Sequence, residues 1–162
     1  MKNLQLNFRE MFINEVLEVS KLHNELAYFI QRETQDEYWD FEILSEDNIS
    51  KHIQSFVDNA ERKIYIAKDN DKILGFIACE IIQCHLPISS VNKVGYISGA
   101  FVLPEYRGKG ILRSLEALVT EYFKACGLRF VELNFISNNI LAKKSWEGLG
   151  YKTFREQARK TI

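Results

Sequence analysis

Two glycines and three basic residues stand together in the second half of the chain, in a pattern suited to binding a phosphate group. Gly108 and Gly110 permit backbone torsions and close approaches that a side chain would forbid. Arg107, Lys109 and Arg113 surround them, and a helix is predicted to begin near Gly110. Free N–H groups at a helix start attract anions. An ordinary solvated turn is the alternative, and two glycines with three cations favour the anion site over it.

The common nucleotide-binding loops do not match this stretch. The Walker pattern GxxxxGK[ST] does not occur in it. The dinucleotide fingerprint GxGxxG fails at its third glycine, because Arg113 stands there. That fingerprint also opens a parallel domain at its first strand, whereas this loop lies two-thirds along the chain. The sequence therefore disfavours a nucleotide-binding protein of either kind.

The stretch resembles the acyl-CoA loop of the GCN5-related N-acetyltransferase (GNAT) family. In that family a strand is followed by V-x-P, two residues, and [QR]-x-x-G-x-[GA] at the start of a helix. Val102, Pro104, Arg107 and Gly110 match this pattern. Leu112 departs from it, because the family prefers Gly or Ala there, and its side chain slightly crowds the place of the pyrophosphate.

A second segment strengthens the resemblance. Asn139, followed by the run from Trp146 to Tyr151, is similar to the family's signature N-x(6)-Y-E-x-x-G-[FY]. The resemblance implies acetyl-CoA as co-substrate, with Asn139 hydrogen-bonding it from the far side or capping a helix, or both. The other implied cofactor-binding residues lie beside the pantetheine arm (Ala100, Phe101, Val102) or under the pyrophosphate (Arg107, Gly108, Lys109, Gly110, Ile111, Leu112, Arg113).

The side chains that usually do acid–base chemistry in this family are absent. Trp146 stands where a tyrosine commonly protonates the leaving thiolate, and an indole N–H does not titrate. We therefore predict that Trp146 packs and that water protonates the thiolate. Ser98 and Gly99 stand where the family usually has an acid on the strand before the loop.

Three other side chains are candidates for the missing base. Glu80 comes first, because it is the one charged residue in the apolar strand expected at 73–84. That strand is expected to lie beside the strand that leads into the loop. Glu80 could equally face solvent. Tyr96 and His85 follow, with packing and surface exposure as their alternatives. Small residues at Gly95 and Gly99, with Ala100, predict a bulge that separates this strand from residues 129–136.

An acidic and aromatic stretch at residues 36–42 is the candidate for binding the acceptor. In this fold the connection between the first two helices commonly borders the acceptor cleft. Tyr38, Trp39 and Asp40, with the neighbouring acids, suit a cationic amine through charge attraction and cation–π contacts. A solvated acidic turn whose aromatic residues pin the helices is the alternative.

Hydrophobic periodicity predicts the elements that must position these residues. The expected order is β-α-α-β-β-β-α-β-α-β, with strands at 4–8, 63–68, 73–84, 94–102, 129–136 and 151–162. The expected helices cover 12–32, 45–57, 110–127 and 139–149, and Ser45 caps the second of them. This is the mixed α/β order of the GNAT acyltransferase fold, a mostly antiparallel central sheet flanked by helices.

Composition limits the remaining function classes. With 162 residues, 46% hydrophobic and 27% charged, the chain is expected to form a single domain over residues 1–162. A net charge of −1 gives no field that favours nucleic acid or a membrane. Three cysteines without metal-ligand spacing predict reduced thiols, no metal and a cytoplasmic location, and the first residues lack the apolar core of a signal peptide. A homodimer stays open.

The predicted function is transfer of an acetyl group from acetyl-CoA to a primary amine of a small molecule or peptide. The alternative is a non-catalytic acyl-CoA-binding or sensory module of the same fold, because the usual tyrosine and the usual strand acid are missing. Polyamines, aminoglycosides, amino acids and protein N-termini all remain open as acceptors.

Overall fold

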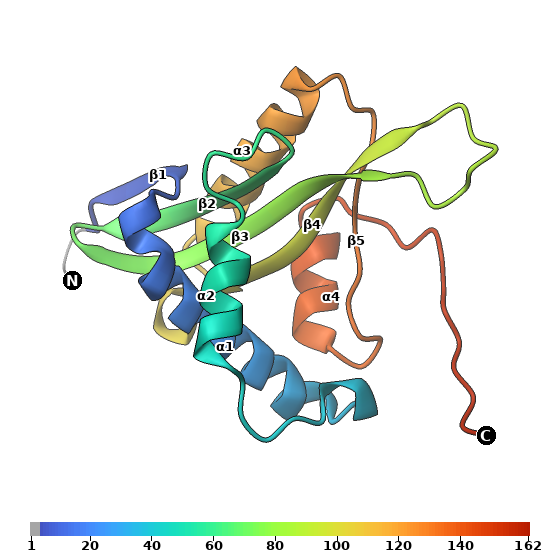
Figure 1. Cartoon of the computed structure of the whole chain (residues 1–162), viewed down its shortest axis with the longest axis horizontal. Helices are drawn as coiled ribbons and strands as arrows, with labels where there is room; N and C mark the ends of the chain where they lie inside the picture. Colours follow the sequence, from blue (N-terminus) through green and yellow to red (C-terminus); the bar gives the residue numbers. More distant parts are fainter. Residues whose placement is uncertain (1–3) are drawn as a thin grey trace.

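A five-stranded sheet with the order β1-β2-β3-β4-β5 forms the centre of the computed structural model, which describes residues 4–162 (Figure 1). The strands are β1 (Leu6–Glu10), β2 (Arg62–Asp69), β3 (Lys72–Gln83), β4 (Lys93–Val102) and β5 (Val131–Leu133). Neighbouring strands pair antiparallel from β1 to β4, and β5 pairs parallel with β4. This confirms the predicted mixed, mostly antiparallel sheet. Residues 1–3, part of the segment tested for a signal peptide, lie outside the described residues.

Four α-helices and three short 3-10 helices complete the described chain. The α-helices are α1 (Val16–Thr34), α2 (Glu46–Gln54), α3 (Ile111–Ala125) and α4 (Ile140–Glu147). The 3-10 helices are η1 (Ile13–Glu15), η2 (Glu37–Trp39) and η3 (Pro104–Tyr106). Ser45 caps α2 as predicted, since its hydroxyl accepts a hydrogen bond of 3.3 Å from the Asn48 N–H.

Two hydrophobic cores lie on the two faces of the sheet, because successive strand residues point to opposite sides. Helices α1 and α2 cover one face, where Ile64 and Ile66 of β2 join Phe76 of β3 in the core. Helices α3 and α4 pack on the other face, where Ala67 and Ile77 are buried. Strand β3 is buried from residue 73 to residue 79, which confirms its predicted central position.

A bulge in β4 opens the sheet on one side. Ala78 of β3 pairs with Gly99 while its neighbour Cys79 pairs with Ile97, so Ser98 is the extra residue. Strand β5 pairs with β4 only as far as Ile97, and β4 continues without it to Val102. The two strands therefore diverge beyond the bulge, as predicted.

Gly95 has a different role from the one predicted. A Cβ atom on this residue would lie 2.3 Å from the ring of Phe123, so the missing side chain lets α3 pack tightly on β4. Gly95 lies within the part of β4 that is still paired with β5, three residues before the bulge. The prediction that it belongs to the bulge was wrong, whereas Gly99 does flank it.

Two predicted strands also need correction. The strand expected at 129–136 is limited to Val131–Leu133. Beyond Leu133, β4 turns away at the bulge and leaves residues 134–136 unpaired. The strand expected at 151–162 does not form, and residues 152–162 are all exposed. Five of these eleven residues are charged, so neither face of the segment could be buried against a sheet. In Figure 1 this segment runs along the outside of the molecule to the C-terminus.

Candidate active site

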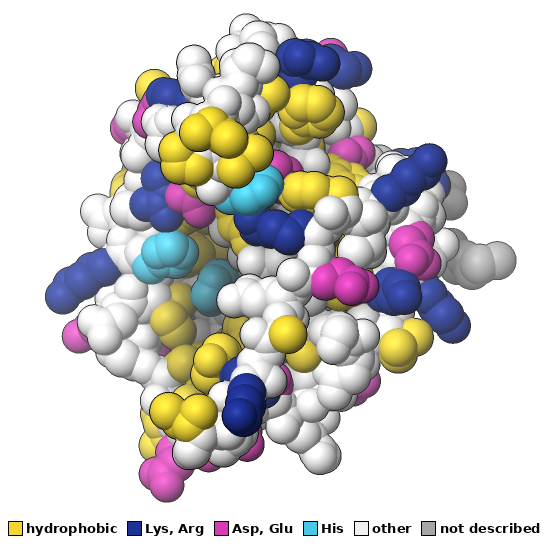
Figure 2. Space-filling view, turned by 90° about the vertical axis from the view of Figure 1, so that its right-hand side faces the viewer, with side chains coloured by type: hydrophobic (Ala, Val, Ile, Leu, Met, Phe, Trp, Pro, Cys, Tyr) yellow, Lys and Arg dark blue, Asp and Glu magenta, His cyan; other side chains and the backbone are white. Residues whose placement is uncertain are grey.

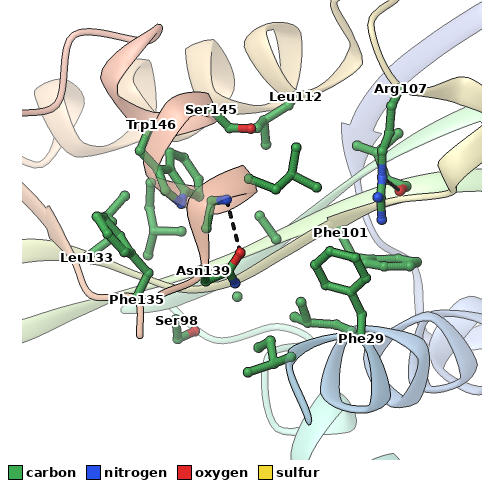
Figure 3. Close-up of a pocket in the computed structure, with 18 of the residues that line it drawn as sticks. Phe29, Ser98, Phe101, Arg107, Leu112, Leu133, Phe135, Asn139, Ser145 and Trp146 are labelled. Carbon is green, nitrogen blue, oxygen red and sulfur yellow. Dashed lines mark hydrogen bonds between the residues drawn. The ribbon is translucent and has the colours of Figure 1, made fainter. Parts of the chain in front are cut away.

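A cavity of about 450 Å³ lies where β4 and β5 diverge. Its walls come from α1, the second half of β4, the start of α3, the segment after β5, and α4. In Figure 3, Asn139 and Trp146 lie on one side of this cavity, and Phe29, Phe101 and Arg107 lie on the other. The volume falls within the usual range for sites that bind small molecules.

The loop before α3 is built as an anion site. Gly108 has a φ of 73° and Gly110 a φ of 77°, both in the left-handed region that favours glycine. A Cβ atom on either residue would meet no protein atom within 4 Å, so the space beside the backbone is open. Ser114 is the first helical residue whose N–H reaches a carbonyl, that of Gly110, at 3.0 Å. The N–H groups of residues 111–113 are therefore left for a ligand.

Arg107 is held in place at the edge of the cavity. Its Nε donates a hydrogen bond of 2.9 Å to the Val102 carbonyl at the end of β4. Its guanidinium carbon lies 4.8 Å from the centre of the Phe29 ring and 5.4 Å from that of Phe101. Burial lowers the pKa of Arg107, and a guanidinium nevertheless stays charged at neutral pH. A fixed positive charge thus lines the cavity beside the loop.

The other two basic residues of the loop differ in placement. Arg113 lines the cavity and donates a hydrogen bond of 3.2 Å to the Gly148 carbonyl, which joins the start of α3 to the end of α4. Lys109 lies with its ammonium 5.0 Å from the centre of the Tyr106 ring and is not part of the cavity wall.

Asn139 closes the cavity from the side of α4. Its side-chain oxygen accepts a hydrogen bond of 3.1 Å from the Ala142 N–H, drawn in Figure 3, so the residue caps α4 as predicted. Only 5% of Asn139 is exposed, and it lines the cavity. The cap uses the oxygen alone and leaves the side-chain NH₂ group available to a ligand.

Trp146 is a packing residue of α4. It is 8% exposed, and its ring meets the Tyr151 ring edge-on with 5.5 Å between centroids. Tyr151 in turn donates a hydrogen bond of 2.9 Å to the Glu116 carboxylate on α3. One edge of the indole reaches the cavity, where Ser145 and Leu112 lie beside it.

The structure does not bring the three predicted base candidates into the cavity. Glu80 faces α1 and α2, and its carboxylate lies 3.4 Å from Nε of Arg62. Tyr96 lies opposite Glu80 on β4, at the side of the bulge where β4 and β5 are still paired. Burial raises the pKa of Tyr96. His85 is exposed on the loop after β3, with its ring 6.0 Å from that of Phe154.

A histidine that the sequence analysis did not single out lies in the cavity wall. His23 on α1 lines the cavity together with Ser98 of the bulge. Burial lowers the pKa of His23 to about 4, and the nearby His52 adds to the effect. The spacing of His23, Leu26 and Ile30 places them on one face of α1, and this pattern is visible in the sequence. It does not show whether that face lines a cavity or packs in the hydrophobic core.

The predicted acceptor stretch is only partly at the cavity. Trp39 lines it, whereas the neighbouring Tyr38 is 79% exposed and Asp40 is outside its wall. Asp36 accepts two hydrogen bonds, of 3.2 and 2.9 Å, from Arg159 in the C-terminal segment. The Arg159 guanidinium also lies 4.4 Å from the centre of the Tyr38 ring, and it lowers the pKa of Asp36.

Residues 4–162 show neither a membrane-spanning helix nor a cluster of metal ligands. No helix in this part of the chain is long and apolar enough to cross a membrane. Likewise, the described residues contain no group of three or more His, Cys, Asp or Glu side chains that could hold a metal ion.

Comparison with known proteins agrees with the geometry of the cavity. A family model described as "Acetyltransferase (GNAT) family" matches residues 23–151. An uncharacterized N-acetyltransferase of Methanocaldococcus jannaschii is 35% identical over 94 residues, which are 57% of this chain and 40% of that protein. The chain thus spans less than half the length of this curated relative.

Two solved structures share the fold at low sequence identity. The aminoglycoside N-acetyltransferase AAC(6')-Iy in complex with CoA has a TM-score of 0.81 and 17% identity, over 99% of this chain and 97% of that one. A tetramutant of the BH1408 protein from Bacillus halodurans has a TM-score of 0.83 and 22% identity, over 96% and 99% of the two chains. Because the family model covers well over half of the sequence and includes the glycine loop and Asn139, the chain belongs to the acetyltransferase (GNAT) family.

Proposed function

We propose that this chain transfers an acetyl group from acetyl-CoA to a primary amine of a small molecule or peptide. One observation carries the proposal: the opening between β4 and β5 and the glycine-led start of α3 belong to the same cavity. An acyl-CoA needs both features, because its pantetheine arm is long and narrow and its pyrophosphate carries negative charge.

The residues present fit this ligand. The pyrophosphate would rest on the free N–H groups of residues 111–113, next to Arg107 and Arg113. A side chain at Gly110 would fill the space that the phosphate needs. The pantetheine arm would pair with the edge of β4 at residues 100–102, which has no strand partner there among the described residues. The free NH₂ group of Asn139 would donate to it from the α4 side.

The chemistry then requires polarisation of the thioester and loss of protons from the amine. An unpaired N–H near the end of β4 would donate to the carbonyl oxygen as negative charge develops on it. The nitrogen bonds to the acetyl carbon, the C–S bond breaks, and the CoA thiolate takes a proton from water. A thiol pKa of about 8.5 makes this leaving group tolerable without an acid such as tyrosine at Trp146.

The acceptor would enter beside Trp39 and the face of α1 that lines the cavity. The acidic residues around η2 would attract a cationic amine, although Arg159 already neutralises Asp36. We place Glu80 farther from the amine than the sequence suggested, because it pairs with Arg62 outside the cavity wall. Tyr96 and His85 have no part in this proposal.

A non-catalytic acyl-CoA-binding module is the second candidate. Trp146 occupies the place of the usual tyrosine, and an indole N–H does not titrate, so it has no role in proton transfer. Ser98 and Gly99 offer no carboxylate at the bulge. Such a module would bind acetyl-CoA through the same loop and release no thiol.

Two measurements test the proposal. A thermal-shift series with acetyl-CoA, CoA, NAD and ATP should show stabilisation by the first two alone. Release of free thiol from acetyl-CoA in the presence of spermidine, kanamycin, lysine or a short peptide should then exceed the rate without protein. Stabilisation without thiol release for all four amines would favour the binding module, and stabilisation by NAD or ATP alone would contradict both candidates.

We also propose a single domain over residues 1–162 and a cytoplasmic location, as monomer or homodimer. The three cysteines support this location, because all of them are unpaired: Cys79, Cys84 and Cys126. Burial raises the pKa of Cys79 to about 12, so this thiol is inert.

A further inference from the structure

An unpartnered histidine stands in the cavity wall on the side of α1. The His23 ring stacks on Phe76 with 6.1 Å between centroids and an angle of 28° between planes. Its Nδ1 is buried and has no hydrogen-bond partner among residues 4–162. Buried polar atoms in proteins are nearly always paired, so this enclosed nitrogen is an exception. Nδ1 itself does not reach the cavity, and Nε2, which is not among the buried unpaired atoms, is the ring nitrogen open to a ligand.

His23 lies close to the bulge where the reaction would take place. Phe76, on which the imidazole stacks, also lies beneath Gly99, since a Cβ atom there would be 3.8 Å from the Phe76 ring. Ser98, the extra residue of the bulge, lines the same cavity as His23. The imidazole therefore borders the point where β4 loses its β5 partner and where the thioester would be held.

Polar side chains lead from His23 to the surface. The ring of His52 on α2 lies edge-on to the His23 ring, with 5.9 Å between centroids. His52 as a whole is exposed, and its imidazole is partly buried. This partial burial and the charge of Arg62 lower the pKa of His52, while the charge of Glu80 raises it. Arg62 and Glu80 form an ion pair with 3.4 Å between nitrogen and oxygen. Figure 2 shows histidine side chains gathered on this face beside basic and hydrophobic ones.

We propose that His23 is the catalytic base of the acetyl transfer, and that the proton leaves through His52 toward the Glu80–Arg62 pair and solvent. This inference rests on the proposed function. As the amine nitrogen bonds to the acetyl carbon, one of its protons moves to a ring nitrogen of His23, and the C–S bond breaks to release the CoA thiolate. The proton then passes from the His23 ring to the His52 ring, which lies edge-on to it with 5.9 Å between centroids.

The charge state of His23 suits this role. The rings beside it are Phe76 from the sheet and His52 from α2, with Arg62 and Glu80 beyond His52. Because burial lowers its pKa to about 4, the ring is neutral at pH 7. It is also a weak base, so it takes the proton only as the new C–N bond makes the amine N–H acidic. The same low pKa makes it release that proton quickly, so a path to solvent is needed. Between pH 6 and 8, therefore, protonation of His23 should not limit the rate.

The test uses the full chain and its three histidines. Thiol release from acetyl-CoA is measured with spermidine, kanamycin, lysine and a short peptide for the wild type, His23→Gln, His23→Ala, His52→Gln and His85→Gln. His23→Gln should lower turnover by about a hundredfold or more, and imidazole in the buffer should restore part of the activity of His23→Ala. His52→Gln should cause a smaller loss. His85→Gln is the matched control, since His85 lies outside the cavity.

Two binding and charge measurements separate a chemical role from a structural one. The Kd for CoA should be unchanged in His23→Gln, and CoA should still raise its melting temperature. Nuclear magnetic resonance of the histidine rings should show His23 neutral at pH 6, with the three signals assigned through the variants.

The outcomes distinguish this inference from the function on which it rests. If the wild type turns over and His23→Gln keeps at least a third of its rate, His23 is not the base, and the acetyltransferase function still stands. A cationic His23 ring at pH 6 would have the same meaning. A wild type that binds CoA but releases no thiol with any of the four amines would contradict the acetyltransferase and the base together. Equal losses in His23→Gln and His85→Gln would also overturn the specific role of His23.

Discussion

The two sides of the cavity are built from different parts of the chain. On the cofactor side, the contacts offered to a ligand are mostly backbone N–H groups, at the start of α3 and along the free edge of β4. On the acceptor side, the polar atoms belong to side chains of separate elements, such as His23 of α1 and Trp39 of η2.

This difference explains which substitutions each side of the cavity tolerates. A backbone site depends on φ angles and on the absence of side chains, so only substitutions that add bulk or alter the turn destroy it. A site made of side chains from separate elements depends on how those elements pack, and each residue can be replaced without changing the fold. Within one family, the cofactor side should therefore stay constant while the acceptor side determines which amine is used.

The largest expected effect is on the cofactor side. Gly110→Asp would place a carboxylate and a Cβ atom in the open space beside the first turn of α3. We expect CoA affinity to fall by at least a hundredfold, because the phosphate would meet both bulk and negative charge. Calorimetric titration with CoA measures this.

Gly127→Asp is the matched control for that substitution. Gly127 has a φ of 74°, close to that of Gly110, and open space beside it, but it lies at the far end of α3. The control should carry the same backbone strain and keep CoA affinity. Equal affinity in the two variants would show that the loop does not hold the phosphate.

The acceptor side depends on the anchoring of α1, and the next prediction concerns its stability. Glu15, at the start of α1, is 6% exposed and accepts hydrogen bonds of 2.7 and 2.8 Å from Arg9 and 2.9 Å from Lys68. Glu15→Gln would leave those cations without their partner and should lower the free energy of unfolding by about 3 kcal/mol. Glu10→Gln is the control, because the Glu10–Lys63 pair is more exposed and worth about 0.5 kcal/mol.

The same carboxylate makes stability depend on pH. Hydrogen bonds from Arg9 lower the folded pKa of Glu15 to about 2, against an ordinary value of 4.5. Its contribution is therefore fully present above pH 4.5 and is lost progressively as the pH falls toward 2. Between pH 4.5 and pH 2, urea unfolding should show a smaller loss of the free energy of unfolding for Glu15→Gln than for the wild type. Parallel pH curves for the two proteins would contradict this linkage.

The sequence predicted the cofactor side better than the acceptor side for a physical reason. The loop from Arg107 to Arg113 and the cap at Asn139 are local, so their residues lie close together whatever the rest of the chain does. The place of His23 depends on how α1 packs over β3 and β4, which no local pattern determines. Glu80 was assigned to the correct strand with its face left open, and the bulge at Ser98 decides which residues reach the cavity.

The ends of strands were predicted least well. Residues 129–136 and 151–162 both contain β-branched or aromatic residues, and their pairing depends on a free neighbouring edge. The divergence at the bulge removes that edge for part of the first segment. The second follows the outside of the molecule and contacts it through Phe154 and Arg159.

A smaller effect is expected for Trp146 on the cofactor side. Trp146→Phe should lower the free energy of unfolding by roughly 1–3 kcal/mol, because the contact with Tyr151 weakens and a void remains. Turnover should stay within about threefold of the wild type, since the indole has no part in proton transfer. Chemical denaturation and thiol release measure the two quantities. A thousandfold loss of turnover with an unchanged unfolding curve would instead assign a chemical role to the indole.

The smallest effect is expected at the rim of the acceptor side, where Arg159 of the C-terminal segment covers an acid and an aromatic ring. Its guanidinium donates to Asp36 at 2.9 Å and lies over Tyr38 at 4.4 Å, the two kinds of contact that a cationic acceptor would use. Arg159→Ala should leave the unfolding curve unchanged, because the pair is exposed, and should lower the KM for spermidine by no more than about fivefold.

Lys160→Ala removes the same charge one residue farther along and serves as the control for Arg159→Ala. It should leave the KM for spermidine unchanged, because the contacts with Asp36 and Tyr38 belong to Arg159. The Kd for CoA should be the same in both variants, since neither residue lines the cavity. A KM that rises in Arg159→Ala would mean that the C-terminal segment helps to hold the acceptor, and the acidic stretch at η2 would then act through its aromatic residues alone.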